Sequence, residues 1–173
     1  MDVGIILTEL SSVRESYKVA LELEERFNRR KGINTDLIDL MDFQYPDFEN
    51  TGLGHFINSS QLIILVGVAN RPVYSHVVHY LLDLYHQEFE AKCVNSAFVG
   101  RHADKLCRQL TQTFKDLDGQ CHTKGLAIED VSGAFDYRLD LQNAELASLM
   151  ETFITGNCEG MQMRKATVNI VYS

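Results

Sequence analysis

The segment from 8 to 16, TELSSVRES, has residue types that could hold a phosphate group. Hydroxyl side chains, the free backbone amides of a helix start and the guanidinium of Arg14 all donate hydrogen bonds to anions. A structural role is also open, because Ser11 or Ser12 would cap the helix, with Glu15 completing a capping box from Ser12. The two glutamates of the segment bring negative charge close, which weakens the anion interpretation. The residues alone leave phosphate binding undecided, whereas a helix cap is expected in either case.

The segment from 67 to 73, GVANRPV, joins the apolar run QLIILV to a helical pattern. A plain connection between a strand and a helix needs no such sequence. Gly67 and Ala69 would leave room for the backbone to approach a ligand, while Asn70 and Pro72 would shape the turn. We therefore expect this loop to lie against a ligand.

The elements that must position these loops alternate between short apolar runs typical of strands and longer helical patterns. The predicted strands are 3–8, 33–40, 61–66, 93–99 and one within 120–131. The third of them is apolar throughout, which predicts a central place in the sheet. The last helical pattern ends near residue 154, and a β-like run at 166–172 in the following tail predicts an added edge strand or an interface arm.

Five strands that alternate with helices predict an α/β fold with a parallel sheet covered by helices on both faces. Right-handed crossovers leave few topologies. For one domain spanning residues 1–173, the flavodoxin-like three-layer sandwich with strand order 2-1-3-4-5 is expected. In that order the connections of the first and third strands leave toward opposite faces, and such sheets bind ligands in the crevice at their carboxyl ends. Both loops would line that crevice.

Charge and cysteine usage narrow the class of protein. A formal net charge of −8 argues against a general binder of nucleic acid or of acidic membranes. The longest apolar stretch is too short to span a bilayer, and the start of the chain does not look like a signal peptide. The four cysteines, Cys93, Cys107, Cys121 and Cys158, form no CxxC pair, so we expect reduced, mostly buried thiols in a cytoplasmic protein.

A stripe of polar side chains at helical spacing, His76, His79, Asp83 and His86, falls opposite the apolar face of the same predicted helix. A metal site, as in a metal hydrolase, would use the last three of them. Three ligands along one helix rarely complete a coordination sphere, so a solvated or subunit-contact face is the favoured interpretation.

Two further groups of residues lie near the expected crevice. Arg101 and His102 open the helix after the fourth strand, where they would meet either a substrate phosphate or only water. Tyr45, Pro46 and Phe48 could form an aromatic lid, although half-buried packing is the favoured interpretation.

The order of short motifs over residues 3–155 resembles the NADPH-dependent FMN reductase family of flavodoxin-like proteins. Ser11-Ser12-Val13-Arg14 is similar to the family's Gly-Ser-x-Arg loop, and Leu37-Ile38-Asp39-Leu40 to its LIDL run. After the third strand, Val68-Ala69-Asn70-Arg71 takes the place of Pro-Glu-Tyr-Asn, and Leu82-Asp83-Leu84 that of Leu-Asp-Trp.

The resemblance implies an enzyme that passes reducing equivalents from NAD(P)H through FMN to a small-molecule acceptor. It implies a homodimer or homotetramer that needs neither a metal nor a protein nucleophile. The FMN phosphate would be held by the first loop, and the ring would lie between the loops after the third and fourth strands. The residues implied are Thr8, Ser11, Ser12, Arg14, Ser16, Val68, Ala69, Asn70, Arg71, Pro72, Val73, Gly100, Arg101 and His102.

An alternative keeps the fold but not the cofactor. Ser11 stands where the family has its first glycine, and no tyrosine precedes Asn70. A flavodoxin-like protein with an eroded flavin site, acting as a non-catalytic binding or assembly module, would also have this sequence.

Overall fold

The computed structural model describes residues 1–10, 15–43, 48, 52–69, 72–90, 92–116, 123–129 and 143–171 of the chain. For 72–75 and 163–171 the description is of the backbone alone.

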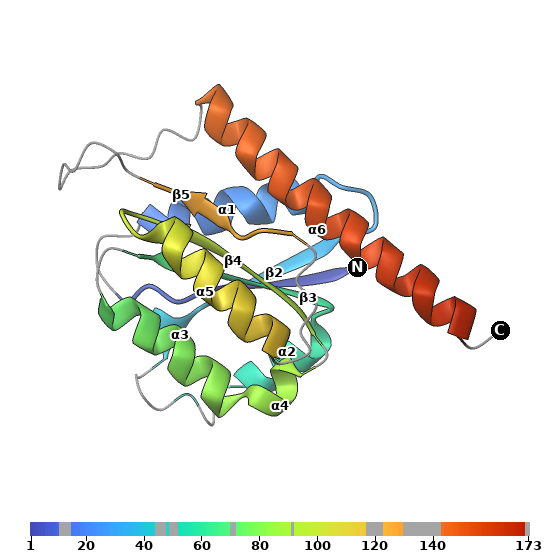
Figure 1. The fold of residues 1–173 in the computed structure, drawn as a ribbon, viewed down its shortest axis with the longest axis horizontal. Coiled ribbons are helices and arrows are strands. Elements are labelled where there is room, and N and C mark those ends of the chain that lie inside the picture. The colour runs from blue at the N-terminus through green and yellow to red at the C-terminus, as the bar shows by residue number, and fades with distance from the viewer. Residues whose placement is uncertain are drawn as a thin grey trace.

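The chain forms a five-stranded parallel sheet of order β2-β1-β3-β4-β5, as the alternation of elements predicts. Figure 1 shows helices on both sides of this sheet. The strands are β1 (Asp2–Leu7), β2 (Asn34–Asp39), β3 (Leu62–Val68), β4 (Cys93–Val99) and β5 (Leu126–Ile128). The helices are α1 (Glu15–Asn28), α2 (Leu53–Ser59), α3 (Pro72–Leu84), α4 (His86–Phe89), α5 (Ala103–Asp116) and α6 (Ala144–Val171), with a 3-10 turn at Leu40–Asp42.

Every residue of β3 and β4 is buried, which explains the unbroken apolar run of the third strand. Side chains that alternate along the strands enter two separate cores. Ile64 and Val66 join the core under α1 and α6, whereas Ile63 and Leu65 join the core under α2, α3, α4 and α5. The helices that follow β1 and β3 therefore cover opposite faces of the sheet, as the predicted topology requires.

The end of the chain differs from the sequence prediction. Residues 166–171 belong to α6, which runs unbroken from Ala144 to Val171, so the late strand was a wrong prediction. No proline interrupts the pattern after residue 154. Gly156, which could mark a helix end, instead packs against Thr123, whose side chain a Cβ at this position would strike. Figure 1 shows the last turns of α6 extending beyond the sheet.

Buried amide side chains fix the position of α6 on the sheet. Asn95 Nδ2 of β4 donates to Asn157 Oδ1 of α6 at 2.9 Å and to Thr123 Oγ1 at 2.8 Å. Asn157 Nδ2 donates in turn to Phe153 O, one helical turn earlier, at 2.8 Å. Asn95 and Asn157 are 1% and 4% exposed. Because buried polar groups are costly when unpaired, this network favours one register of the helix.

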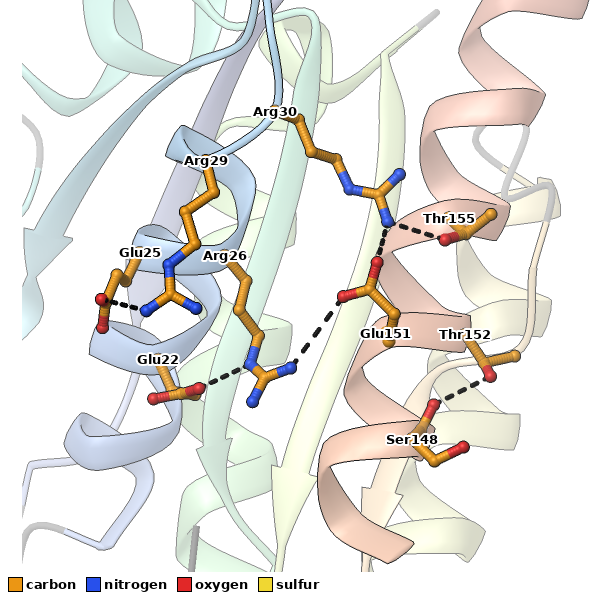
Figure 2. Close-up of polar contacts among 9 residues, drawn as sticks. All are labelled: Glu22, Glu25, Arg26, Arg29, Arg30, Ser148, Glu151, Thr152 and Thr155. Carbon is orange, nitrogen blue, oxygen red and sulfur yellow. Dashed lines mark hydrogen bonds and ion pairs between the residues drawn. The ribbon is translucent and has the colours of Figure 1, made fainter. Parts of the chain in front are cut away.

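Charged side chains connect α6 to α1 at the surface (Figure 2). Glu151 of α6 forms ion pairs with Arg26, at 3.9 Å, and with Arg30. Arg30 also donates to Thr155 Oγ1 at 2.8 Å, and Arg26 pairs with Glu22 within α1. Exposed ion pairs of this kind contribute little each, so the apolar core and the buried amides do most to hold α6 in place.

Candidate ligand site at the carboxyl edge of the sheet

Three predicted site residues, Thr8, Ala69 and Gly100, lie together just after the ends of β1, β3 and β4. Leu7 pairs with Val66 and Val68 pairs with Val99, which brings the three strand ends to one edge. Each following loop begins with a backbone hydrogen bond that extends the sheet. The bonds are Thr8 N to Val66 O (2.8 Å), Ala69 N to Val99 O (2.7 Å) and Gly100 N to Ile128 O (2.9 Å). Since β1 and β3 lead to helices on opposite faces, this edge contains the topological switch point at which such sheets bind ligands.

Gly67 has a different role from the one the sequence suggests. It lies within β3, and a Cβ there would strike Thr8 Oγ1 and come within 2.8 Å of Phe98 Cε1. Thr8 itself is 1% exposed and donates its hydroxyl to Val66 O at 3.0 Å. The space beside Gly67 is therefore filled by two side chains of the protein rather than left for a ligand.

We expect Gly67→Ala to lower the free energy of unfolding by about 2 kcal/mol, because an added methyl overpacks this site. A double-mutant cycle with Thr8→Ala, followed by denaturant unfolding, checks the cause. Removal of the Thr8 hydroxyl relieves part of the clash, so Gly67→Ala should cost less in that background. Equal costs in both backgrounds would show that Thr8 does not set the requirement for glycine.

The first loop is closed by Glu9 at the start of α1. The Glu9 side chain is 2% exposed, and its Oε2 accepts hydrogen bonds from the backbone N of Ser16, at 3.2 Å, and from the Ser16 hydroxyl. Ser16 is fully buried. Ser11, Ser12 and Arg14 lie outside the described residues.

A phosphate group does not fit the described donors of this loop as they stand. The Ser16 amide and hydroxyl already bind a carboxylate, whose negative charge would repel a phosphate at the same place. Within the described ranges, the buried side-chain polar atoms that lack a partner are Glu15 Oε2, Thr35 Oγ1 and Ser96 Oγ. The first is a carboxylate oxygen, and the other two belong to the start of β2 and the middle of β4. None of these three is a vacant phosphate donor at the crevice.

The second loop begins with buried residues at the end of β3. Val68 and Ala69 are 8% and 5% exposed, and Pro72 and Val73 form the first residues of α3. Asn70 and Arg71 lie outside the described residues. The small Ala69 side chain thus lies at the carboxyl edge, and α3 begins three residues later.

The third loop turns sharply at Gly100, whose φ of +120° is a conformation that favours glycine. Arg101 and His102 follow and are exposed. The loop ends at α5, where the Asp104 backbone N donates to Glu129 Oε1 at 3.3 Å. The Arg108 guanidinium forms an ion pair with Asp104, and this contact raises the pKa of the guanidinium.

Sequence reasoning did not identify the two carboxylates that meet helix starts at this edge. In the sequence, Glu9 indicates only negative charge near the first loop, and no pattern marks Glu129. Both residues follow directly on a strand end, Glu9 two residues after β1 and Glu129 one residue after β5. An acidic residue just after a strand end, where it can reach the N-terminus of a helix, is the sequence signal that could have identified them.

Phe48 packs inside the protein rather than forming a lid, but the half-buried position that we expected is wrong. Phe48 is fully buried in the core under α2, α3, α4 and α5. Its ring lies 6.2 Å from that of Tyr80, and its carbonyl accepts from the Tyr85 hydroxyl at 2.5 Å. Tyr45 and Pro46 lie outside the described residues.

The polar stripe is divided by the structure, since α3 ends at Leu84 and His86 begins α4. His76, His79, Asp83 and His86 are all exposed. Within the described part of the chain, no group of three His, Cys, Asp or Glu side chains is placed to hold a metal ion.

Cys93, Cys107 and Cys158 are buried thiols rather than halves of a disulfide, as predicted, and Cys121 lies outside the described residues. Burial raises the pKa of the Cys158 thiol, which keeps it protonated. Among the helices of the described ranges, none has the length and apolar character that crossing a membrane would require.

Comparison with known proteins identifies the class of fold. No protein-family model and no curated protein sequence matches the chain. Among solved structures, an NADH:FMN oxidoreductase in its apo form matches 89% of this chain and 88% of its own, with a TM-score of 0.68 and 12% identity. A flavodoxin from Streptococcus pneumoniae TIGR4 matches 92% of this chain and 99% of its own, with a TM-score of 0.60 and 10% identity.

A third likeness is to rubredoxin:oxygen oxidoreductase from Desulfovibrio gigas, with a TM-score of 0.66 and 12% identity. That match covers 95% of this chain but 37% of the larger protein. At such low sequence identities these similarities support a shared fold alone. They agree with the strand order and the helix-covered faces described above. The chain has the flavodoxin-like fold.

Proposed function

We propose that this chain is a flavin-binding redox protein, a divergent relative of the NADPH-dependent FMN reductases. The single observation that carries the proposal is the switch point between β1 and β3, whose following helices cover opposite faces of the sheet. A flavin ring would lie at this carboxyl edge, near Ala69 and Gly100. The likeness to a flavodoxin and to an NADH:FMN oxidoreductase supports the choice of ligand.

The chain's own residues would bind and orient the ring. Ala69 and the turn at Gly100 lie side by side at the edge of the sheet, because β3 and β4 pair up to Val68 and Val99 and Ala69 N donates to Val99 O. Arg101 and His102 are exposed next to this turn, where they would meet the phosphates of NAD(P)H. The bound flavin would supply the hydride chemistry and pass reducing equivalents to a small-molecule acceptor.

Anaerobic addition of NADH or NADPH to the flavin-loaded protein tests this function. We expect one of the two to bleach the absorption of the oxidised flavin, and a small acceptor to restore it. If the loaded protein is reduced by neither nucleotide, the reductase activity is refuted, while flavin binding itself is tested separately by titration.

A second candidate function is favoured by the first loop. Glu9 occupies the donors at the start of α1, and the space beside Gly67 is filled. Both observations suit a flavodoxin-like protein that has lost its flavin and serves as a non-catalytic binding or assembly module. A purified protein that takes up no flavin but forms a defined homodimer or homotetramer would support this alternative.

A further inference from the structure

The start of α1 carries a built-in anion. A helix N-terminus attracts negative charge, because its first backbone amides have no partner within the helix. Here the partner of the Ser16 amide is the Glu9 carboxylate, which reaches back from the loop seven residues earlier. The Ser16 hydroxyl donates to the same oxygen, so a single carboxylate oxygen collects two donors.

Both ends of this contact are fixed by the fold. Thr8, the residue before Glu9, is tied to β3 through its backbone N and its hydroxyl. Ser16 is fully buried in the first turns of α1. With only 2% of Glu9 exposed, its side chain cannot turn to solvent unless the loop moves. Displacement would therefore break charge-assisted hydrogen bonds that hold the loop together.

The carboxylate at α5 offers a direct contrast. Glu129 Oε1 accepts from the Asp104 backbone N at the same edge of the sheet, but Glu129 is exposed. It can leave for water at little cost, as exposed charged pairs generally do. The Glu9 carboxylate is thus a buried part of the fold, whereas the Glu129 carboxylate lies at the surface.

We propose that Glu9 is an internal substitute for a ligand phosphate, and that it closes the phosphate position at the start of α1. This inference rests on the proposed function, because it assigns that position to the phosphate of FMN. Its consequence is specific to that group. The chain would bind the flavin ring, but FMN would have no advantage over riboflavin, which carries the same ring without the phosphate.

Titration of the full chain with FMN and with riboflavin, followed by flavin fluorescence, tests the inference. In the unaltered protein the two dissociation constants should agree within about twofold. Glu9→Gln keeps the side-chain shape and removes the charge, so FMN should then bind at least about tenfold more tightly than riboflavin. Glu129→Gln is the matched control, because it removes the same charge from the other helix start and should leave the ratio within about twofold.

Two outcomes would overturn the inference. One is an unaltered protein that already prefers FMN by tenfold or more, and the other is a Glu9→Gln ratio equal to that of Glu129→Gln. Glu9→Ala, read in the same way, decides the matter if Glu9→Gln fails to fold.

The failure of the proposed function gives a different pattern, in which no variant binds riboflavin or FMN. Inorganic phosphate then serves as the probe. The inference predicts that phosphate raises the melting temperature of Glu9→Gln above that in chloride of equal ionic strength, but does not do so for the unaltered protein or Glu129→Gln. Equal melting temperatures for Glu9→Gln in the two salts would show that no anion position is closed by Glu9.

Discussion

Replacement of Phe98 by alanine is expected to lower the free energy of unfolding by about 3–5 kcal/mol, the usual cost of such a truncation in a core. Phe98 lies in β4 one residue before its carboxyl end and is fully buried. Its ring fills the space beside Gly67, so the truncation leaves a cavity directly under the candidate site. Equilibrium unfolding in urea or guanidinium chloride measures the effect.

The control for this prediction is Phe98→Leu, which keeps much of the volume and should cost about 1.5 kcal/mol or less. A loss below about 1 kcal/mol for Phe98→Ala would contradict the packing described here. It would mean that the sheet edge collapses around the gap, and that Gly67 owes its place to something other than the phenylalanine ring.

Asn157→Asp is expected to cost about 3 kcal/mol at neutral pH. The new carboxylate can still accept from Asn95, but it can no longer donate to Phe153 O, and it places a charge where 4% of the side chain is exposed. Burial should raise the pKa of the aspartate by about two units in the folded state, and each unit corresponds to about 1.4 kcal/mol.

The pH dependence of Asn157→Asp has a definite sign. A carboxyl whose pKa is raised in the folded state lowers the free energy of unfolding only at pH values where the carboxyl ionises in the unfolded chain. The charge penalty is therefore absent below the unfolded pKa of about 3.9 and grows as the pH rises toward the folded value. Asn143→Asp is the matched control, because Asn143 is exposed and caps α6 through Oδ1, a role that aspartate performs equally well. If both variants lose the same stability at every pH, the amide network does not fix α6.

The sheet could be predicted from the sequence because its signals are local. The apolar run at 61–66 and the β-rich run at 93–99 each indicate a strand without knowledge of their neighbours, and β4 has the predicted bounds. Right-handed crossovers then leave little choice of order. The end of α6 was predicted wrongly because residues 166–171 have local β propensity, which the continuation of a helix already docked on the sheet overrides.

The candidate site was harder to predict, because its decisive contacts join distant residues. Gly67 has its role through Thr8 and Phe98, which lie on neighbouring strands. Glu9 has its role through Ser16, across a loop whose conformation no local rule specifies. Sequence patterns correctly predicted the strand order that brings the ends of β1, β3 and β4 to one edge. They could not reveal that the protein's own side chains occupy positions that a ligand was expected to take.

Whether a flavin ring binds at the carboxyl edge of the sheet is tested by titrating the unaltered, isotope-labelled protein with riboflavin and following the NMR signals of its backbone amides. Riboflavin lacks the phosphate, so the result depends on the ring position and not on Glu9. We expect saturable shifts at Thr8, Ala69 and Gly100, and none at Gln61 and Lys92, which precede β3 and β4 at the opposite edge. Absence of saturable shifts, or shifts confined to that opposite edge, would show that no flavin ring binds at the carboxyl edge of the sheet.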